Sequence, residues 1–523
     1  MRYRASVAAI ALLCFAGGAQ AADPTRVLRV IPSADVAELD PTHGPNAIAR
    51  VYGNMVFDTL FALDHTMTAR PMMVDKETIS PDGLTYTFTL RPGLNFHDGS
   101  PVRAPDVVAS LNRFMGFGSI GVTLRSKVAS LTVVDDRTVR LALNQPFGLV
   151  EYILASPGGA MAAVLREQDA TRPDTVPMTE PIGSGPFRYV ASERESGHRV
   201  VFERNPDYPA RAEPADGLAG ARVVKVDRVE WTIIPDATTA ANALATGEID
   251  VWDTASTDLA GFLRQHGVVV KQTAPLQTMG FVRPNFQIPP FNDVRARRAL
   301  ALLFDQKDFM EATAGDTVPW RTCYAFTACG SKLETEVGSE PYRHPDIAKA
   351  KQLLAEAGYK GEPVVVVTSP QMTAINALAQ VAAQRLRDAG VNVDLQAQDW
   401  TTMFQRITTP NLTGAAKWNL FASTAGGGSW WHPFTNIGLD SSCTLHNFAG
   451  FPCDPVGEKL RQAIFAAQGD AAQKTAFEAF QRRMWDFIPY VPVGQFDAVN
   501  AWRSNVTGML DSYVITYWNL EKR

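Results

Sequence analysis

The stretch VEWTIIPDATTAANALATGEIDV, residues 229–251, decides the fold. Residues 229–234 are typical of a strand, and residues 237–245 are typical of a helix. Gly247 follows as the residue that ends this helix, because glycine adopts the left-handed cap conformation without a steric cost. Residues 249–251 then predict a second strand, so the segment is a β-α-β unit.

The same alternation continues on both sides of this unit. Strands are predicted at residues 26–31, 85–90, 138–144, 364–368 and 391–396. Helices are predicted at 293–304 with Asn292 as cap, at 345–357 with Pro345 in the first turn and Gly358 as stop, and at 374–389 with Gly390 as stop. This pattern predicts an α/β fold.

The first 21 residues have the pattern of a secretory signal peptide. Arg2 and Arg4 precede an apolar run over residues 5–16, and Ala19-Gln20-Ala21 is an A-x-A cleavage signal. We therefore expect export and removal of residues 1–21. Cys14 lies inside this segment without the small preceding residue of a lipid-attachment site, so no membrane anchor is expected.

Composition restricts the class of partner. The formal net charge is −5, and loss of Arg2 and Arg4 with the leader leaves −7. No block of Lys and Arg occurs, which argues against nucleic acid or an anionic membrane as partner. No later stretch reaches ~18 uninterrupted apolar residues, so we expect a soluble mature chain of two or three domains.

Four cysteines remain after the leader. Their even number and the oxidising compartment predict two loop-closing disulfides, and proximity favours Cys323–Cys329 and Cys443–Cys453 among three possible pairings. A zinc site is the alternative, but neither C-x2-C nor H-x3-5-H spacing is present. No metal or cofactor is expected.

One longer motif is highly specific. Residues 90–101 read LRPGLNFHDGSP and are followed by Ala104-Pro105-Asp106-Val107. Further motifs follow in order: PIGSGPF (181–187), RNPDY (204–208), ATGEID (245–250), PFNDVR (290–295) and AKQLL (350–354). Together they resemble the extracytoplasmic solute-binding proteins of family 5, the peptide, opine and nickel class that serves ABC importers.

This resemblance implies a bilobal periplasmic-binding-protein fold of the cluster C type, with an extra domain inserted in lobe one. Lobe one would comprise residues 24–50, 180–277 and 488–523, the insert 51–179, and lobe two 278–487. A peptide-like or other small organic solute would be enclosed between the lobes, and the closed form would dock on the permease subunits in the periplasm. A monomer is expected.

The resemblance also implies the ligand-lining positions. They are His43, Gly44, Pro45, Asn46, Trp400, Thr424, Gly426, Gly427, Gly428, Ser429, Trp430, Trp431, Gln495 and Phe496. Core packing remains an alternative for Trp400. If Trp430 and Trp431 lie on a strand, only one of them can face the cleft.

One departure from the family pattern concerns the ligand. Peptide-binding members carry an aspartate in the loop that is Gly426-Gly427-Gly428 here, and this loop contains no acid. Burying an ammonium without a counter-charge is costly. The expected ligand therefore lacks a free α-amino group, or its ammonium meets another acid such as Asp399 or Glu38. The glycines either make room for the ligand or only shape the loop.

Three motifs that suggest chemistry have simpler interpretations. His97-Asp98-Gly99 is a tight-turn signal, Gly183-Ser184-Gly185 lacks hydrolase G-x-S-x-G spacing, and no G-K-[ST] follows the three glycines. We therefore expect a binding protein and not an enzyme. A secreted hydrolase and a sensory receptor that presents its ligand to a signalling partner are the alternatives.

Overall fold

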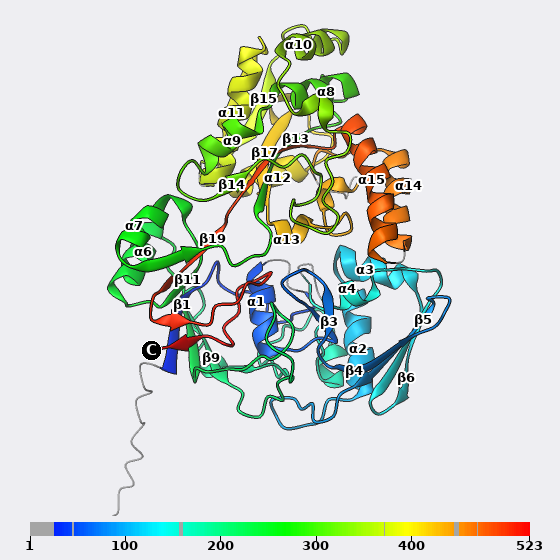
Figure 1. The fold of residues 1–523 in the computed structure, drawn as a ribbon, viewed down its shortest axis with the longest axis vertical. Coiled ribbons are helices and arrows are strands. Elements are labelled where there is room, and N and C mark those ends of the chain that lie inside the picture. The colour runs from blue at the N-terminus through cyan, green and yellow to red at the C-terminus, as the bar shows by residue number, and fades with distance from the viewer. Residues whose placement is uncertain (1–25, 44–46, 156–159, 371, 444–448, 468) are drawn as a thin grey trace, which may run out of the picture.

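The structure is a computed structural model that describes residues 26–43, 47–155, 160–370, 372–443, 449–467 and 469–523. Two lobes lie one above the other, and a third unit flanks the lower lobe (Figure 1). Each lobe is built around one large sheet. The predicted leader, residues 1–21, lies outside the described residues.

The sheet of the first lobe has seven strands drawn from distant parts of the chain. Its order is β12 (Val268–Lys271), β19 (Val499–Arg503), β11 (Val251–Ala255), β1 (Val27–Ile31), β10 (Arg228–Thr232), β9 (Arg199–Arg204), β8 (Phe187–Tyr189). β1 lies parallel to both β10 and β11. Its helices are α1 (Ala47–Val56), α6 (Ala237–Thr246) and α7 (Ala260–Gln265).

The predicted β-α-β unit is confirmed as β10, α6 and β11. The Asp236 side chain accepts the Thr239 N–H at the start of α6, and Gly247 ends the helix with a φ of 87°. The second strand begins at Val251 and not at residue 249, because the Ile249 N–H still bonds to the Ala243 carbonyl.

The sheet of the second lobe has six strands. Its order is β14 (Trp320–Arg321), β18 (Val491–Phe496), β13 (Thr278–Pro284), β17 (Leu420–Ala425), β15 (Val364–Thr368), β16 (Val393–Ala397). Its helices are α8 (Val294–Leu303), α9 (Gln306–Thr313), α10 (Ile347–Glu356), α11 (Thr373–Asp388), α12 (Trp400–Thr408), α13 (Gly427–Trp430), α14 (Pro455–Ala466) and α15 (Asp470–Phe487).

Two helix starts differ from the sequence prediction. Asp293, and not Asn292, caps α8, because its carboxylate accepts the Arg295 N–H at 2.8 Å. α10 begins at Ile347, and Asp346 accepts the Lys349 N–H at 2.8 Å, so Pro345 precedes the helix. In both cases a carboxylate satisfies a backbone donor that the helix itself cannot satisfy.

The third unit lies in the chain between α1 and β8. An antiparallel sheet has the order β4 (Val74–Ile79), β5 (Thr85–Leu90), β7 (Thr138–Leu143), β6 (Val128–Asp135). It is accompanied by α2 (Ala104–Met115), α3 (Gly118–Lys127), α4 (Val150–Leu154), α5 (Glu167–Ala170) and the pair β2 (Phe61–Leu63) and β3 (Ala69–Pro71). β20 (Val506–Thr507) and β21 (Glu521–Lys522) pair near the C-terminus.

Two short crossings join the lobes. Residues 272–277 lead from β12 to β13, and residues 497–498 lead from β18 to β19. The red C-terminal strands pass from the upper to the lower lobe at this point (Figure 1). The boundary expected at 487/488 therefore moves to the second crossing, because β18 pairs with β13 and β14 in the second lobe.

Among the residues that the structure describes, no single helix has the length and apolar character to span a bilayer, although the bent pair Ala104–Met115 and Ile120–Lys127 passes the same criterion jointly.

Candidate functional site

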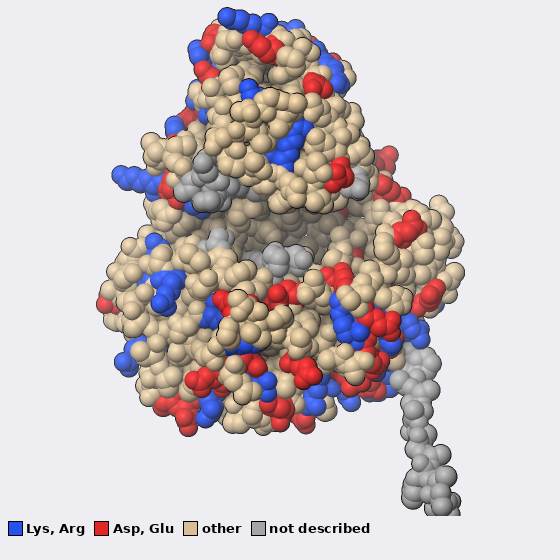
Figure 2. Space-filling model, turned by 180° about the vertical axis from the view of Figure 1, so that it is seen from behind, with Lys and Arg blue, Asp and Glu red and all other residues tan. Residues whose placement is uncertain are grey.

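A cavity of about 300 Å³ lies where the two crossings meet, and we call it the hinge cavity. The molecule is visibly hollowed between the lobes when seen from behind (Figure 2). Its wall comes from both lobes: Ser33, Ala47, Arg50, Val51, Asp253, Thr254, Thr273, Ala274, Leu276, Thr278, Gly426, Gly427, Gly428, Ser429, Ala498, Val499, Asn500, Ser512, Tyr513, Val514 and Ile515.

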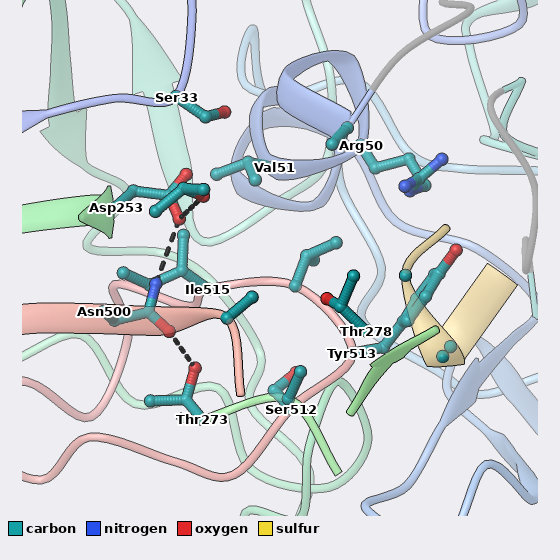
Figure 3. Close-up of a pocket in the computed structure, with 18 of the residues that line it drawn as sticks. Ser33, Arg50, Val51, Asp253, Thr273, Thr278, Asn500, Ser512, Tyr513 and Ile515 are labelled. Carbon is teal, nitrogen blue, oxygen red and sulfur yellow. Dashed lines mark hydrogen bonds between the residues drawn. The ribbon is translucent and has the colours of Figure 1, made fainter. Parts of the chain in front are cut away.

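One side of the hinge cavity carries a buried carboxylate in a polar network. Asp253 Oδ1 accepts from Asn500 Nδ2 at 3.0 Å, and Asn500 Oδ1 accepts from Thr273 Oγ1 at 2.6 Å (Figure 3). Burial raises the pKa of the Asp253 carboxyl, although hydrogen bonds from Thr254, Ser33 and Asn500 partly offset this. Among the described residues no Lys or Arg is placed within ion-pair distance of Asp253, so a cationic ligand group would be favoured here.

The opposite side carries a cation on an aromatic ring. Arg50 lies over the Tyr513 ring, with 5.1 Å between its Cζ atom and the ring centroid. Asp253 and Asn500 lie on one side in Figure 3, and Arg50 and Tyr513 lie on the other. Ser512 lines the same cavity, and its buried Oγ has no hydrogen-bond partner among the described residues. The cavity thus offers an acid on one side and a cation on the other, with the Ser512 hydroxyl beside Thr273.

The three glycines have two different roles. A Cβ on Gly427 would lie 2.3 Å from the Gln277 carbonyl oxygen, and one on Gly428 would lie 2.2 Å from the Tyr513 ring. A Cβ on Gly426 would meet nothing within 4 Å. Gly427 and Gly428 are therefore required by close packing of the lobes, and only Gly426 leaves room for a ligand.

The lobes touch each other directly beside these glycines. Ser429 Oγ and Tyr513 Oη are 3.1 Å apart. Farther out, Trp431 Nε1 donates to Tyr152 Oη of the third unit at 2.6 Å, and the Gly148 N–H donates to the Phe465 carbonyl at 3.1 Å. The structure is thus a form in which the second lobe contacts both neighbouring units.

Four residues of the predicted set, Gly426, Gly427, Gly428 and Ser429, line the hinge cavity. The structure places several others elsewhere. His43 lies near Asp40, with 3.3 Å between Nδ1 and Oδ2, and packs on Phe117. Gly44, Pro45 and Asn46 lie outside the described residues, just before Ala47 and Arg50 of the cavity wall.

Trp400 is placed outside the wall of the hinge cavity. Asp399 caps α12 by accepting the Thr402 N–H at 2.9 Å, which makes Trp400 the first helical residue. Its ring lies 5.7 Å from that of Phe404 and packs against the core. The core-packing alternative therefore describes its observed position.

The two adjacent tryptophans lie at the end of the short helix α13, and not on a strand. Trp430 is buried and stacks on Phe281 with 4.6 Å between ring centroids. Trp431 is also buried and lies in the interface with Tyr152. The condition that the pair lies on a strand is not met, because β17 ends at Ala425.

The remaining predicted positions lie on the strands of the second lobe. Thr424 of β17 pairs with Gly280 of β13, and Phe496 of β18 pairs with Thr278 of β13. Gln495 is fully buried and accepts the Cys329 N–H at 3.0 Å, which orients the adjacent disulfide loop. None of these three belongs to the described wall of the hinge cavity.

Both predicted disulfides are confirmed. Cys323 and Cys329 pair with 6.0 Å between Cα atoms, and Cys443 and Cys453 pair with 4.2 Å. The zinc alternative is thereby excluded for these four thiols. Among the described residues no group of three or more His, Cys, Asp or Glu side chains is placed to hold a metal ion.

Residue-based reasoning missed the acid of the cavity. Asp253 follows the ATGEID motif on β11, but nothing in its sequence surroundings distinguishes it from a core strand residue. Glu38 bonds to the Asp40 N–H and Asp399 caps α12, so the described cavity wall includes neither of the acids that the sequence suggested.

His97 has the structural role expected of it. Its Nε2 lies 3.0 Å from the Gly185 carbonyl, and burial lowers its pKa to about 4. The turn Asp98-Gly99-Ser100 is closed by the Ser100 N–H and Oγ, which both donate to Asp98 Oδ1.

Comparison with known proteins agrees with this architecture. The family model of the bacterial extracellular solute-binding proteins, family 5, matches residues 68–444. A "Probable peptide ABC transporter periplasmic-binding protein" of Sinorhizobium fredii is 33% identical over 494 residues, which cover 93% of this chain and 92% of the relative. A glutathione-binding protein of Escherichia coli is 27% identical over 496 residues, 90% of this chain and 89% of the relative.

A solved structure shows the same fold. The crystal structure of a Pseudoalteromonas dipeptide-binding protein in complex with Met-Leu has a TM-score of 0.78 at 21% identity, covering 95% of this chain and 100% of that one. The chain therefore belongs to the bacterial extracellular solute-binding proteins of family 5, and it is the solute-binding component of an ABC importer.

Proposed function

We propose that this protein captures a peptide-like, zwitterionic solute in the hinge cavity and delivers it to the permease subunits of its importer. The observation that carries the proposal is the pair of opposite charges on facing sides of one cavity, Asp253 and Arg50. A buried carboxylate such as Asp253 is stabilised when a ligand supplies the opposite charge.

The ammonium end of the solute would lie at Asp253. Hydrogen bonds from Asn500 and Thr254 orient the carboxylate at 3.0 and 3.1 Å and leave it without a cationic partner among the described residues. Asp253 thus replaces, from the first lobe, the acid that is missing from the glycine loop of the second lobe.

The carboxylate end would lie toward Arg50. A guanidinium offers several donors in a planar array that suits a carboxylate. The comparisons support a peptide-like ligand. The Sinorhizobium relative is named for peptide transport, and the Pseudoalteromonas structure holds a dipeptide.

Compartment, state and domain limits form part of the same proposal. The chain would act in the periplasm as a monomer after removal of residues 1–21, without catalysing a reaction. Lobe one would comprise 24–56, 180–277 and 498–523, because α1 belongs to it whole, the inserted domain 57–179, and lobe two 278–497. The contacts of Trp431 and Ser429 with the opposite units support a clamp that closes on its ligand.

Calorimetric titration tests the ligand class. We expect Ala-Ala to bind the wild type and N-acetyl-Ala-Ala to bind far more weakly, because acetylation removes the charge that meets Asp253. Asp253→Asn, which keeps the side-chain shape, should weaken Ala-Ala by about 10- to 1,000-fold, since a buried charge would lose its partner. Equal binding of the free and acetylated dipeptides would contradict the proposal. Native mass spectrometry of protein purified without added solute would identify a retained ligand directly.

A further inference from the structure

Two more cavities continue the hinge cavity outward. A middle cavity of about 430 Å³ shares Ala274 and Leu276 with the hinge cavity. An outer cavity of about 280 Å³ shares Met67, Lys332 and Trp431 with the middle cavity. The three cavities thus form a row that runs from the hinge to the interface between the third unit and the second lobe.

A pair of carboxyl groups lies at the outer cavity. Glu151 lines the cavity, and Glu77 of β4 lies within hydrogen-bond reach of Glu151 without lining the cavity itself, so the pair shares a proton below about pH 7. Burial, and then the neighbouring charge of Glu151, raises the pKa of Glu77 to about 7. Glu77 Oε1 is buried, and no described residue bonds to it.

A second polar group of the outer cavity also lacks a partner. His432 lines the cavity and is 1% exposed. Its Nδ1 accepts the Phe434 N–H at 3.1 Å, so the proton of the neutral ring resides on Nε2. Nε2 is buried, and the described residues offer it no acceptor. A buried donor without a partner is costly and indicates a group that is supplied from outside.

The other ionisable groups around the pair come from four elements or loops. Tyr86 of β5 lies close to both carboxyl groups, and burial raises its pKa to about 12, so it is neutral. Lys332 and Asp470 of the second lobe form an ion pair with each other at 3.1 Å. Burial lowers the pKa of His432 to about 3 and keeps it neutral. The net charge at the cavity edge is therefore that of the Glu77 and Glu151 pair.

We propose that the outer cavity is a second subsite for the same solute, in which Glu77 and Glu151 bind an organic cation, a guanidinium or an ammonium, while His432 Nε2 donates to a neighbouring ligand oxygen. This inference rests on the proposed function and extends it to an elongated solute with a basic end. An organic cation fits better than a metal ion, because among the described residues no group with three metal-ligating side chains is present.

The proposal has a direct consequence for protons. A bound cation favours the fully ionised carboxyl pair, so binding releases the shared proton. By linkage, affinity for a basic ligand must then rise as the pH increases through about 7. A ligand with a neutral end gains nothing from this change.

A matched pair of tripeptides tests the subsite. Ala-Ala-Arg and Ala-Ala-citrulline have nearly the same shape and differ in one charge. Calorimetry at pH 8 should show the arginine peptide binding at least about tenfold tighter, because charge-assisted hydrogen bonds are the stronger kind. The advantage should shrink at pH 6, and Glu151→Gln should abolish it. Glu248→Gln, an exposed change in the turn after α6, is the matched control and should retain the advantage.

Each outcome bears on the inference. Equal binding of the two tripeptides, or an arginine preference that Glu151→Gln leaves intact, would overturn the subsite even if Ala-Ala binds as proposed for the hinge cavity. If no peptide binds, the ligand class proposed for the hinge cavity fails. The subsite is then tested separately by identifying the solute that the purified wild type retains. A retained solute without a basic group would overturn it, and one with a basic group whose retention is lost in Glu151→Gln would support it.

Discussion

Gly428→Ala should weaken ligand binding by keeping the lobes apart. The added methyl group would lie 2.2 Å from Cδ2 and 2.3 Å from Cε2 of Tyr513, so that ring must move. Its displacement sacrifices the contact of its hydroxyl with Ser429, about 0.5–1.5 kcal/mol, and the contact of its ring with Arg50, about 0.5–1 kcal/mol. The closed form thus loses about 1–2.5 kcal/mol, which corresponds to affinity lower by about 5- to 70-fold.

The chain provides its own control for this change. Gly426 lies two residues earlier with a φ of −59°, and a Cβ there meets nothing within 4 Å. Gly426→Ala should therefore bind within about twofold of the wild type. Calorimetry with Ala-Ala compares the two variants, and urea unfolding of the ligand-free proteins should give free energies within about 0.5 kcal/mol of each other. Equal affinities of the two variants would refute the argument that Tyr513 limits closure.

Three further predictions concern stability. His97 has a pKa of about 4 in the folded protein and 6.5 ordinarily. As the pH falls below 6.5, the unfolded chain takes up the proton first, so the folded state loses stability. Between pH 7.5 and 5 this loss is about 2 kcal/mol, and urea unfolding of His97→Gln should lack that share of it. Arg222→Met leaves Asp58 buried without its ion-pair partner at 3.0 Å and should lower the unfolding free energy by about 3–5 kcal/mol. Lys307→Met, in the exposed pair with Glu311, should change the unfolding free energy by under about 1 kcal/mol. Equal effects of the two variants would contradict the role of burial. Replacing Cys443 and Cys453 by Ser should lower the unfolding free energy by about 2–3 kcal/mol, because their bridge closes a short loop. Chemical reduction of this Ser variant opens only the bridge Cys323–Cys329. The prediction is contradicted if the Ser substitutions cost no more than that reduction does.

The sequence predicted the local elements well because their signals are local. A cap such as Asp236 and a stop such as Gly247 act within one turn of the helix that they define, and α6 has both where they were expected. The cysteine pairs were also predictable, since six and ten residues of separation keep the partners close in any fold.

The site was harder to predict because its residues meet only in three dimensions. Asp253 and Asn500 are 247 positions apart and are joined by the pairing of β11 with β19, which no local pattern reveals. The glycine loop was found through the resemblance, yet the reason for Gly428 lies in Tyr513, 85 residues later. Trp400 lies outside the described wall of the hinge cavity, because Asp399 caps α12 there and the Trp400 ring packs beside Phe404.

The position of β19 also determines when the protein can finish folding. β12 reaches the first sheet only through β19, so it waits for residues 499–503, whereas β11 already pairs with β1. The second sheet is complete within residues 278–496 and needs no strand from outside that segment. Contacts of such large sequence separation form slowly because a long loop must close first. β19 therefore sets the point in synthesis at which β12 and the Asp253–Asn500 pair can assemble, after nearly the entire polypeptide has been made.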